Sequence, residues 1–178
     1  MKGGDFLRSE YAEPKALENV LCLLTYSNAL ACKVSVQTGL RIGDVLSLKT
    51  AQIKSNRFTI TEQKTKNKKR VYLPEKLRAE LFSQAGKIWV FESRANADNH
   101  RTRQAVWVDI KRACRALRLP NNITPHSMRK YYAVRLYQKS GDIKKVRESL
   151  GHQNETVTML YAMADVLNSR KKKNCPKL

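Results

Sequence analysis

Arg41 stands in a setting that packing alone does not explain. It lies between apolar residues just before a predicted helix, and Asp44 follows three positions later. A nearly buried arginine needs a partner, and the Asp44 carboxylate could hold its guanidinium. The structural alternative is that the Arg41–Asp44 pair only braces the start of the helix.

Two further groups of side chains could take part in the same chemistry. His126 and Arg129 are three positions apart, so both project near a helix N-terminus, where the helix dipole favours an anion. Tyr161 lies nine residues after His152, which follows Gly151. The structural alternatives are a capping histidine with a surface arginine, and an ordinary helix C-cap followed by a half-buried tyrosine.

Together these residue types suit the binding and transfer of a phosphoryl group. Arginines present planar, bidentate donors to non-bridging phosphate oxygens, and histidines add donors or proton carriers. A tyrosine can act as the nucleophile, and the basic segment 64–70 can supply a mobile lysine. The sequence offers no cluster of carboxylates to hold Mg²⁺. We therefore expect transfer without a metal or cofactor, with fixed cations stabilising the charge of a pentacoordinate phosphorane.

The charge of the chain predicts a polyanionic partner. Its 35 lysines and arginines exceed 15 acidic residues, which gives a formal charge of +20. Nucleic acid is the first candidate, and a membrane surface is second because no basic amphipathic helix carries bulky apolar anchors. Only 7% of the residues are aromatic, which argues against single-strand binding on stacking platforms.

Other protein classes are excluded by composition and patterning. Apolar residues make up 42% of the chain, too many for a disordered basic tail. No apolar run is long enough to span a membrane. The four cysteines are scattered and form no C-x-x-C motif, so we expect neither a zinc site nor a disulfide scaffold.

The apolar periodicity predicts a mixed α+β fold that is mainly helical, with a small three-stranded antiparallel sheet. Residues 57–61 and 70–73 alternate as two strands of a hairpin with a basic tip, and a third strand is expected near 52–54. Four helices are predicted to begin at Pro14, at Ala29 with Asn28 as its cap, at Gly43 and after Pro74. Four more are predicted over residues 103–117, 127–140, 143–150 and 156–168.

In this order, the motifs resemble those of the catalytic domain of the tyrosine recombinases, the phage integrase family. Residues 38–48 match T-G-L-R-I-x-[ED]-x-x-x-L, Lys64 begins a K-T pair, 126–129 match H-x-x-R, 150–152 read L-G-H, and 158–161 match T-x-x-Y. The resemblance covers about residues 12–165. It departs from the common H-x-L-R-H pattern at Met128 and Lys130, a change that affects packing more than chemistry.

The resemblance implies a domain organisation. Residues 1–13 are a lead-in or linker, 14–165 form the catalytic domain, and 166–178 form a basic tail. This tail could dock on a neighbouring protomer, dock on its own protomer or stay disordered. An N-terminal core-binding domain, usual in the family, does not fit before residue 12. The chain is thus expected to be either a truncated catalytic domain or a naturally short member.

The resemblance also assigns a role to each site residue. Tyr161 attacks the scissile phosphate, forms a 3′-phosphotyrosyl link and frees a 5′-hydroxyl. Arg41 and Arg129 clamp the phosphate, and Asp44 orients Arg41. The remaining roles are proton acceptor for His126, hydrogen-bond donor for His152 and general acid for Lys64, with Lys66, Lys68 and Lys69 left open as alternative acids.

The implied activity is site-specific DNA recombination. The partner would be double-stranded DNA, with a monomer when free and a tetramer on two DNA sites during recombination. We expect a cytoplasmic protein of a bacterium, phage or mobile element. Two alternatives stay open: a type IB topoisomerase-like nicking-closing enzyme and a non-catalytic DNA-binding protein on the same fold.

Overall fold

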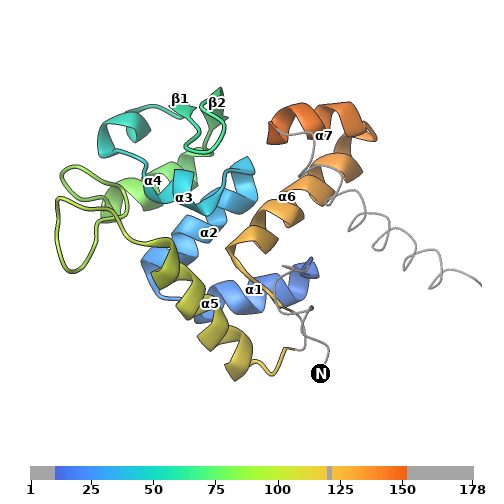
Figure 1. Cartoon of the computed structure of the whole chain (residues 1–178), viewed down its shortest axis with the longest axis horizontal. Helices are drawn as coiled ribbons and strands as arrows, with labels where there is room; N and C mark the ends of the chain where they lie inside the picture. The colour runs from blue at the N-terminus through green and yellow to red at the C-terminus, as the bar shows by residue number, and fades with distance from the viewer. Residues whose placement is uncertain (1–10, 120–121, 152–178) are drawn as a thin grey trace, which may run out of the picture. The chain divides into compact units, whose positions relative to one another are not determined.

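The computed structural model describes residues 11–119 and 122–151 of the 178-residue chain. They fall into two compact units, which divide between Tyr132 and Ala133. None of the helices in these ranges has the length and apolar character that a membrane span requires. In chain order, the elements are α1 (Pro14–Leu23), α2 (Tyr26–Thr38), α3 (Ile42–Leu46), the 3₁₀ helix η1 (Thr50–Lys54), β1 (Arg57–Thr61), β2 (Lys68–Tyr72), α4 (Glu75–Gln84), α5 (Arg103–Ala116), α6 (Pro125–Ser140) and α7 (Ile143–Leu150) (Figure 1).

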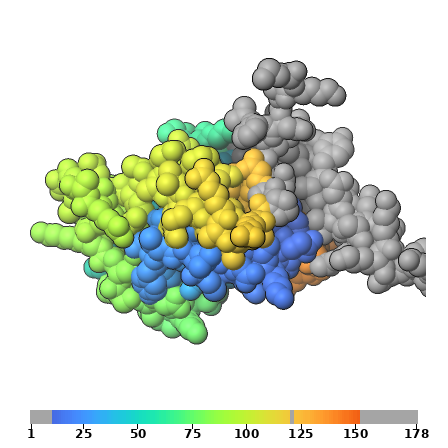
Figure 2. Space-filling view, turned by 90° about the horizontal axis from the view of Figure 1, so that it is seen from below, coloured from blue at the N-terminus to red at the C-terminus, as the bar shows by residue number. Residues whose placement is uncertain are grey.

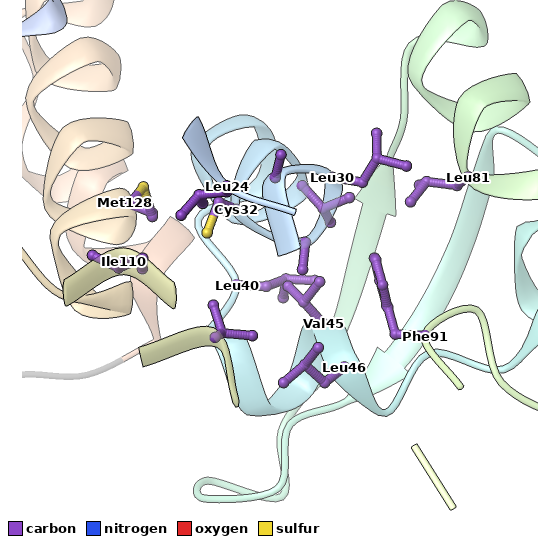
Figure 3. Packing of buried hydrophobic residues seen from close by; sticks show 14 of the residues in the cluster. Leu24, Leu30, Cys32, Leu40, Val45, Leu46, Leu81, Phe91, Ile110 and Met128 are labelled. Atoms are coloured by element: carbon purple, nitrogen blue, oxygen red, sulfur yellow. The ribbon is translucent and has the colours of Figure 1, made fainter. Parts of the chain in front are cut away.

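Helix α2 is the central helix of the first unit, because it packs against α1, α3 and α4. Small residues such as Ala31 and Cys32 are buried along it and allow its neighbours to approach closely. Leu40 and Leu46 continue the same core beyond the end of α2, and Ile110 joins it from α5 (Figure 3). The core therefore surrounds the short turn between α2 and α3, where Arg41 lies.

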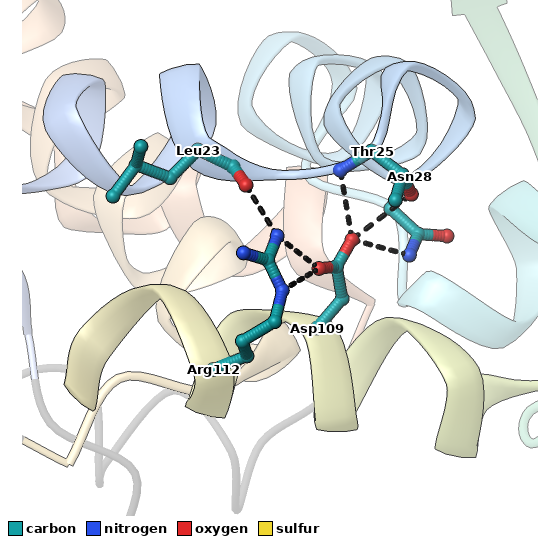
Figure 4. Close-up of polar contacts among 5 residues, drawn as sticks. All are labelled: Leu23, Thr25, Asn28, Asp109 and Arg112. Carbon is teal, nitrogen blue, oxygen red and sulfur yellow. Dashed lines mark hydrogen bonds and ion pairs between the residues drawn. The ribbon is translucent and has the colours of Figure 1, made fainter. Parts of the chain in front are cut away.

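Helix α5 is fixed to the start of α2 by one buried carboxylate. Asp109 Oδ2 accepts hydrogen bonds from the Thr25 backbone N–H and hydroxyl and from Asn28 Nδ2, each at 2.8–2.9 Å (Figure 4). Arg112 donates to the other oxygen of Asp109 and to the Leu23 carbonyl. Burial opposes ionisation, but these hydrogen bonds outweigh it and hold the pKa of Asp109 below its usual value. Figure 2 shows α5, in yellow, beside the blue residues of α1 and α2.

The start of α2 differs from the sequence prediction. The predicted cap was Asn28 with a helix from Ala29, whereas the helix begins at Tyr26 with Thr25 before it. Asn28 is buried inside the helix, and its amide is committed to Asp109. The prediction was wrong because Asn28 has a distant partner, and a distant partner is invisible to local capping rules.

The hairpin pairs β1 with β2 in antiparallel register, with Ile60 opposite Lys69 and Phe58 opposite Val71. Because side chains alternate along a strand, these four residues share one face, on which Ile60 and Val71 are buried. Lys69 therefore lies on the inward face of the hairpin, whereas Lys68 and Arg70 are exposed.

The predicted third strand near 52–54 is not found. In the described residues the sheet has two strands, and this segment forms η1 instead. Gln52 Oε1 accepts a hydrogen bond from the Lys49 backbone N–H and closes a helical turn there. Strand-like pairing occurs earlier, as an isolated bridge between Lys49 and Trp89.

The second unit contains α7, whose two ends match their sequence signals. Asp142 Oδ1 accepts a hydrogen bond of 2.7 Å from the Lys144 backbone N–H, and Gly151 ends the helix in the left-handed conformation with φ of 69°. The predicted helix at 156–168 lies outside the described residues.

Candidate active site

Five charged side chains from separate elements come together in the first unit. We call Arg41, Asp44, Glu62, Lys69 and Arg129 the charged cluster; its members interact electrostatically with one another. Arg129 is 1% exposed and Glu62 is 2% exposed. The three cations exceed the two carboxylates by one charge, so the cluster is formally positive.

Arg41 is positioned by the turn between α2 and α3. Thr38 ends α2, Gly39 adopts the left-handed conformation with φ of 69°, and Leu40 is fully buried. A Cβ at Gly39 would lie 2.4 Å from the Tyr132 ring, so the turn requires glycine for its φ and for this close approach. Arg41 then precedes the first turn of α3. The T-G-L-R sequence thus specifies the backbone that presents the guanidinium.

Arg129 reaches the same turn from α6. Its Nη1 donates a hydrogen bond of 2.5 Å to the Gly39 carbonyl, across 90 positions of sequence. Gly39 caps the C-terminal end of α2, where carbonyls lack intrahelical donors and the helix dipole favours a cation. The two arginines predicted from separate motifs are therefore brought to one turn.

The acidic partner of Arg41 is Glu62, which the sequence analysis did not identify. Arg41 Nη1 forms a 3.3 Å ion pair with Glu62 Oε2, and Thr65 donates a 2.6 Å hydrogen bond to the same oxygen. The predicted partner, Asp44, accepts a 2.8 Å hydrogen bond from the Gln63 backbone N–H. Burial raises the pKa of Asp44 despite this hydrogen bond. Its charge still acts on Arg41 electrostatically.

Lys69 lies next to both arginines. Its Nζ donates a 3.0 Å hydrogen bond to the Thr38 carbonyl and lies 5.9 Å from the centre of the Tyr132 ring. Burial, reinforced by the charge of Arg129, lowers the pKa of the Lys69 ammonium to about 8. The sequence did contain a signal for this placement, because Lys69 alternates with Val71 and Leu73 on the inward face of the strand.

The other predicted site residues are not members of the charged cluster. Lys64 is exposed in the turn of the hairpin, outside the charged cluster. His126 is half-buried in the first turn of α6, and its backbone N–H donates to the Thr124 hydroxyl. His152 and Tyr161 lie outside the described residues.

The cluster has the composition of an anion site. Two guanidiniums and an ammonium supply charged donors, and partial burial strengthens their interaction with an anion. In the part of the chain that the structure describes, no three His, Cys, Asp or Glu side chains gather as a group that could hold a metal ion. A phosphate group is one anion that fits these donors, because guanidinium geometry matches its oxygens.

Comparison with known proteins places this site in context. The model of the phage integrase family matches residues 12–167. The chain is 31% identical over 149 residues to tyrosine recombinase XerA of Thermococcus kodakarensis, a match that covers 79% of this chain and 52% of that protein. It is 30% identical over 146 residues to the putative integrase/recombinase y4qK of Sinorhizobium fredii, with 79% and 47% covered. The chain thus spans about half the length of these relatives.

Solved structures share the fold. The crystal structure of XerA recombinase superposes with a TM-score of 0.71 at 15% identity, covering 99% of this chain and 67% of that one. The catalytic domain of bacteriophage HP1 integrase gives 0.60 at 19% identity, with 94% and 96% covered. A lambda integrase dimer bound to a COC′ core site gives 0.70 at 20% identity, with 90% and 49% covered. These similarities confirm the predicted mainly helical fold with its small antiparallel sheet.

Proposed function

Because the chain belongs to the phage integrase family, we propose that it is a tyrosine-type site-specific DNA recombinase, or the catalytic part of one. The observation that carries the proposal is the meeting of Arg41 and Arg129 at the Gly39 turn, within a formally positive, largely buried cluster. Removing guanidiniums from water is costly, and the two carboxylates of the cluster leave one of its three positive charges without a counter-charge. An anion bound at the cluster would supply that counter-charge. The scissile phosphate of DNA is that anion.

The reaction proceeds in two balanced steps. The Tyr161 oxygen attacks the phosphorus, a 3′-phosphotyrosyl bond forms, and the bond to the 5′-oxygen breaks as that oxygen takes a proton. The 5′-hydroxyl of a second strand then attacks the phosphotyrosyl link and releases the tyrosine. One phosphodiester-type bond replaces another in each step, so no nucleotide cofactor is consumed.

Some of these side chains stabilise negative charge, and others transfer protons. Arg41 and Arg129 hold the non-bridging oxygens and stabilise the charge of the phosphorane. His126 accepts the proton of Tyr161, which needs assistance because an ordinary tyrosine has a pKa of ~10. His152 donates a hydrogen bond to a phosphate oxygen, and Lys64 protonates the leaving 5′-oxygen. Asp44 orients Arg41 through its charge.

Double-stranded DNA is the proposed substrate and partner. The formal charge of +20 supports it, since dispersed cations can follow the phosphates of a duplex. Some of the solved relatives are complexes with DNA, among them XerH bound to difH and lambda integrase bound to a core site. We propose a monomer in the absence of DNA and a tetramer on two duplexes during recombination.

A nicked suicide substrate tests the proposal. Cleavage releases a short fragment, so the protein stays linked to DNA and migrates as a covalent adduct on a denaturing gel. The parent chain should form the adduct. Tyr161→Phe should still bind the duplex but should form no adduct. No adduct from the parent would identify a non-catalytic DNA-binding protein. Relaxation of supercoiled DNA without strand exchange would instead identify a nicking-closing enzyme.

A further inference from the structure

We propose that Lys69 is a positioning residue for the phosphate-binding site: its ammonium holds the turn that presents Arg41 and provides the excess positive charge of the cluster. The inference rests on the proposed function and deepens it. No motif in the sequence marks Lys69, and the exposed Lys64 remains the proposed general acid.

The hairpin register makes the placement of Lys69 unavoidable. Lys69 pairs with Ile60 and alternates with Val71, and both of these neighbours are buried. An apolar residue at this position would continue the core-facing pattern of the strand. A lysine there loses hydration and needs compensating contacts, so its presence calls for a reason other than packing.

The compensating contact is with the backbone of the Arg41 turn. Lys69 donates to the Thr38 carbonyl, and Arg129 donates to the next carbonyl, that of Gly39. Two cations, one from the hairpin and one from α6, thus hold consecutive carbonyls at the C-terminal end of α2. Arg41 follows two residues later, so any shift of this backbone moves its guanidinium.

The charges around Lys69 explain why an ammonium here favours anion binding. The groups that face it are Arg41, Arg129, Asp44 and Glu62, with the Tyr132 ring beside it. With Lys69 protonated, the three cations exceed the two carboxylates by one. With Lys69 neutral, the cluster has no net charge and attracts a phosphate less strongly.

As pH rises and Lys69 loses its proton, the stability of the fold and the affinity for an anion therefore change in opposite directions. Burial beside Arg129 lowers the pKa of Lys69 to about 8, against an ordinary value of ~10.4. Between these values the unfolded chain binds more protons than the folded chain, so the lysine's contribution to stability rises as pH increases from about 8. Over the same range the folded protein loses the ammonium, and its affinity for an anion falls.

Sulfate is a suitable probe, because its charge is constant over this pH range. Thermal unfolding of the full chain is followed with increasing sulfate at matched ionic strength, for the parent, Lys69→Met and Arg70→Met. Arg70 is the control, since it is exposed on the neighbouring position of β2 and its loss changes the net charge equally. The general stabilising effect of sulfate is common to all three proteins.

We expect Lys69→Met to fold and to bind sulfate about tenfold more weakly than the parent at pH 7, a loss of ~1.4 kcal/mol. Its affinity should not vary with pH between ~7 and ~9, whereas that of the parent and of Arg70→Met should fall around Lys69's lowered pKa. Equal sulfate affinities for Lys69→Met and Arg70→Met at pH 7 would overturn the proposal. So would a parent affinity that does not change with pH.

A cleavage assay separates this proposal from the proposed function. In single-turnover cleavage of the suicide substrate, Lys69→Met should be slower than Arg70→Met at saturating DNA. It should not be rescued when sulfur replaces the bridging 5′-oxygen, because Lys69 does not protonate that atom. Rescue by sulfur would make Lys69 the general acid and overturn the positioning role. An adduct formed equally by both variants would refute only the role of Lys69, whereas no adduct from the parent would refute the function.

Discussion

Arg41 and Glu62 form a 3.3 Å ion pair in which the Glu62 side chain is 2% exposed and the Arg41 side chain 15% exposed. The Glu62 oxygen that contacts Arg41 also accepts a hydrogen bond from the Thr65 hydroxyl, and the Glu62 carbonyl accepts one from the Lys66 backbone N–H. Glu62 thus anchors both Arg41, the proposed phosphate ligand, and the loop that carries Lys64. The position of the loop and the position of Arg41 are coupled through it.

Glu62→Gln tests this coupling. The amide keeps an acceptor for Thr65 but removes the charge that holds Arg41. We expect a loss of about 1–3 kcal/mol in the free energy of unfolding, less than for a fully buried pair because Arg41 reaches solvent. Cleavage at saturating DNA should fall more than DNA affinity, since Arg41 loses its orientation but keeps its charge. Urea unfolding and single-turnover cleavage measure the two effects, and a change in affinity alone would contradict the coupling.

Arg41 and Arg129 should not tolerate lysine. Lysine keeps the charge but lacks the planar fork that donates to two phosphate oxygens at once. Arg41→Lys and Arg129→Lys should fold, as near-ultraviolet circular dichroism can verify, and should cleave the suicide substrate at least about a hundredfold more slowly. Cleavage near the parent rate in either variant would assign that arginine to the structural support of the Gly39 turn.

Lys64 is distinguished from its neighbours by the chemistry of the leaving group. A thiolate leaves without protonation, since a thiol of cysteine type has a pKa of ~8.5. Lys64→Ala should cleave ordinary DNA slowly and recover on a substrate with sulfur at the bridging 5′ position. Lys66→Ala is the matched control from the same loop and should show no such selective recovery. Recovery by Lys66→Ala alone would move the acid two positions along the chain.

Duplex binding should depend steeply on salt. A chain with a formal charge of +20 that contacts roughly six to ten phosphates loses about 10³–10⁵ in affinity between ~50 and ~200 mM salt. Fluorescence anisotropy with a labelled duplex, repeated across this salt range, measures the slope. A flat response would mean that base contacts, rather than phosphates, dominate binding.

Asp109 should make stability sensitive to acid. Its lowered pKa means that its stabilising contribution is complete above the ordinary aspartate value of ~3.9 and is lost as pH falls through the folded-state value. Asp109→Asn should lower the free energy of unfolding by about 1–3 kcal/mol at neutral pH and reduce the loss in acid. The exposed Asp98, changed to Asn, is the control and should alter neither quantity.

The sequence predicted those parts of the site that lie in continuous motifs. Arg41 and Arg129 could be identified because the residues next to them define a glycine turn and a helix start. Glu62 could not, because a glutamate before a run of lysines is typical of a solvated loop, and its burial depends on Arg41 from another element. The placement of Lys69 follows from strand alternation, but a basic hairpin tip predicted over 64–69 hid that alternation.

The difference between local sequence signals and distant contacts also explains the errors in the predicted fold. Segment 52–54 alternates briefly like a strand, yet the Gln52 side chain closes a turn and the bridge to Trp89 forms at Lys49. Asn28 has the chemistry of a helix cap, but its amide donates a hydrogen bond to Asp109, which is 81 positions away. In both cases a contact specific to the folded chain outweighed a local preference.

The hydrogen bonds from Thr25 to Asp109 have a consequence for synthesis of the protein. The two residues are 84 positions apart, and at about 5–20 residues per second the ribosome needs about 4–17 s to add the second after the first. During that interval the segments that form α1 and α2 lack the carboxylate that joins their connecting turn to α5. A nascent chain stalled before Asp109 would expose the apolar residues of these segments. We expect a chaperone such as a ribosome-bound holdase to bind those residues.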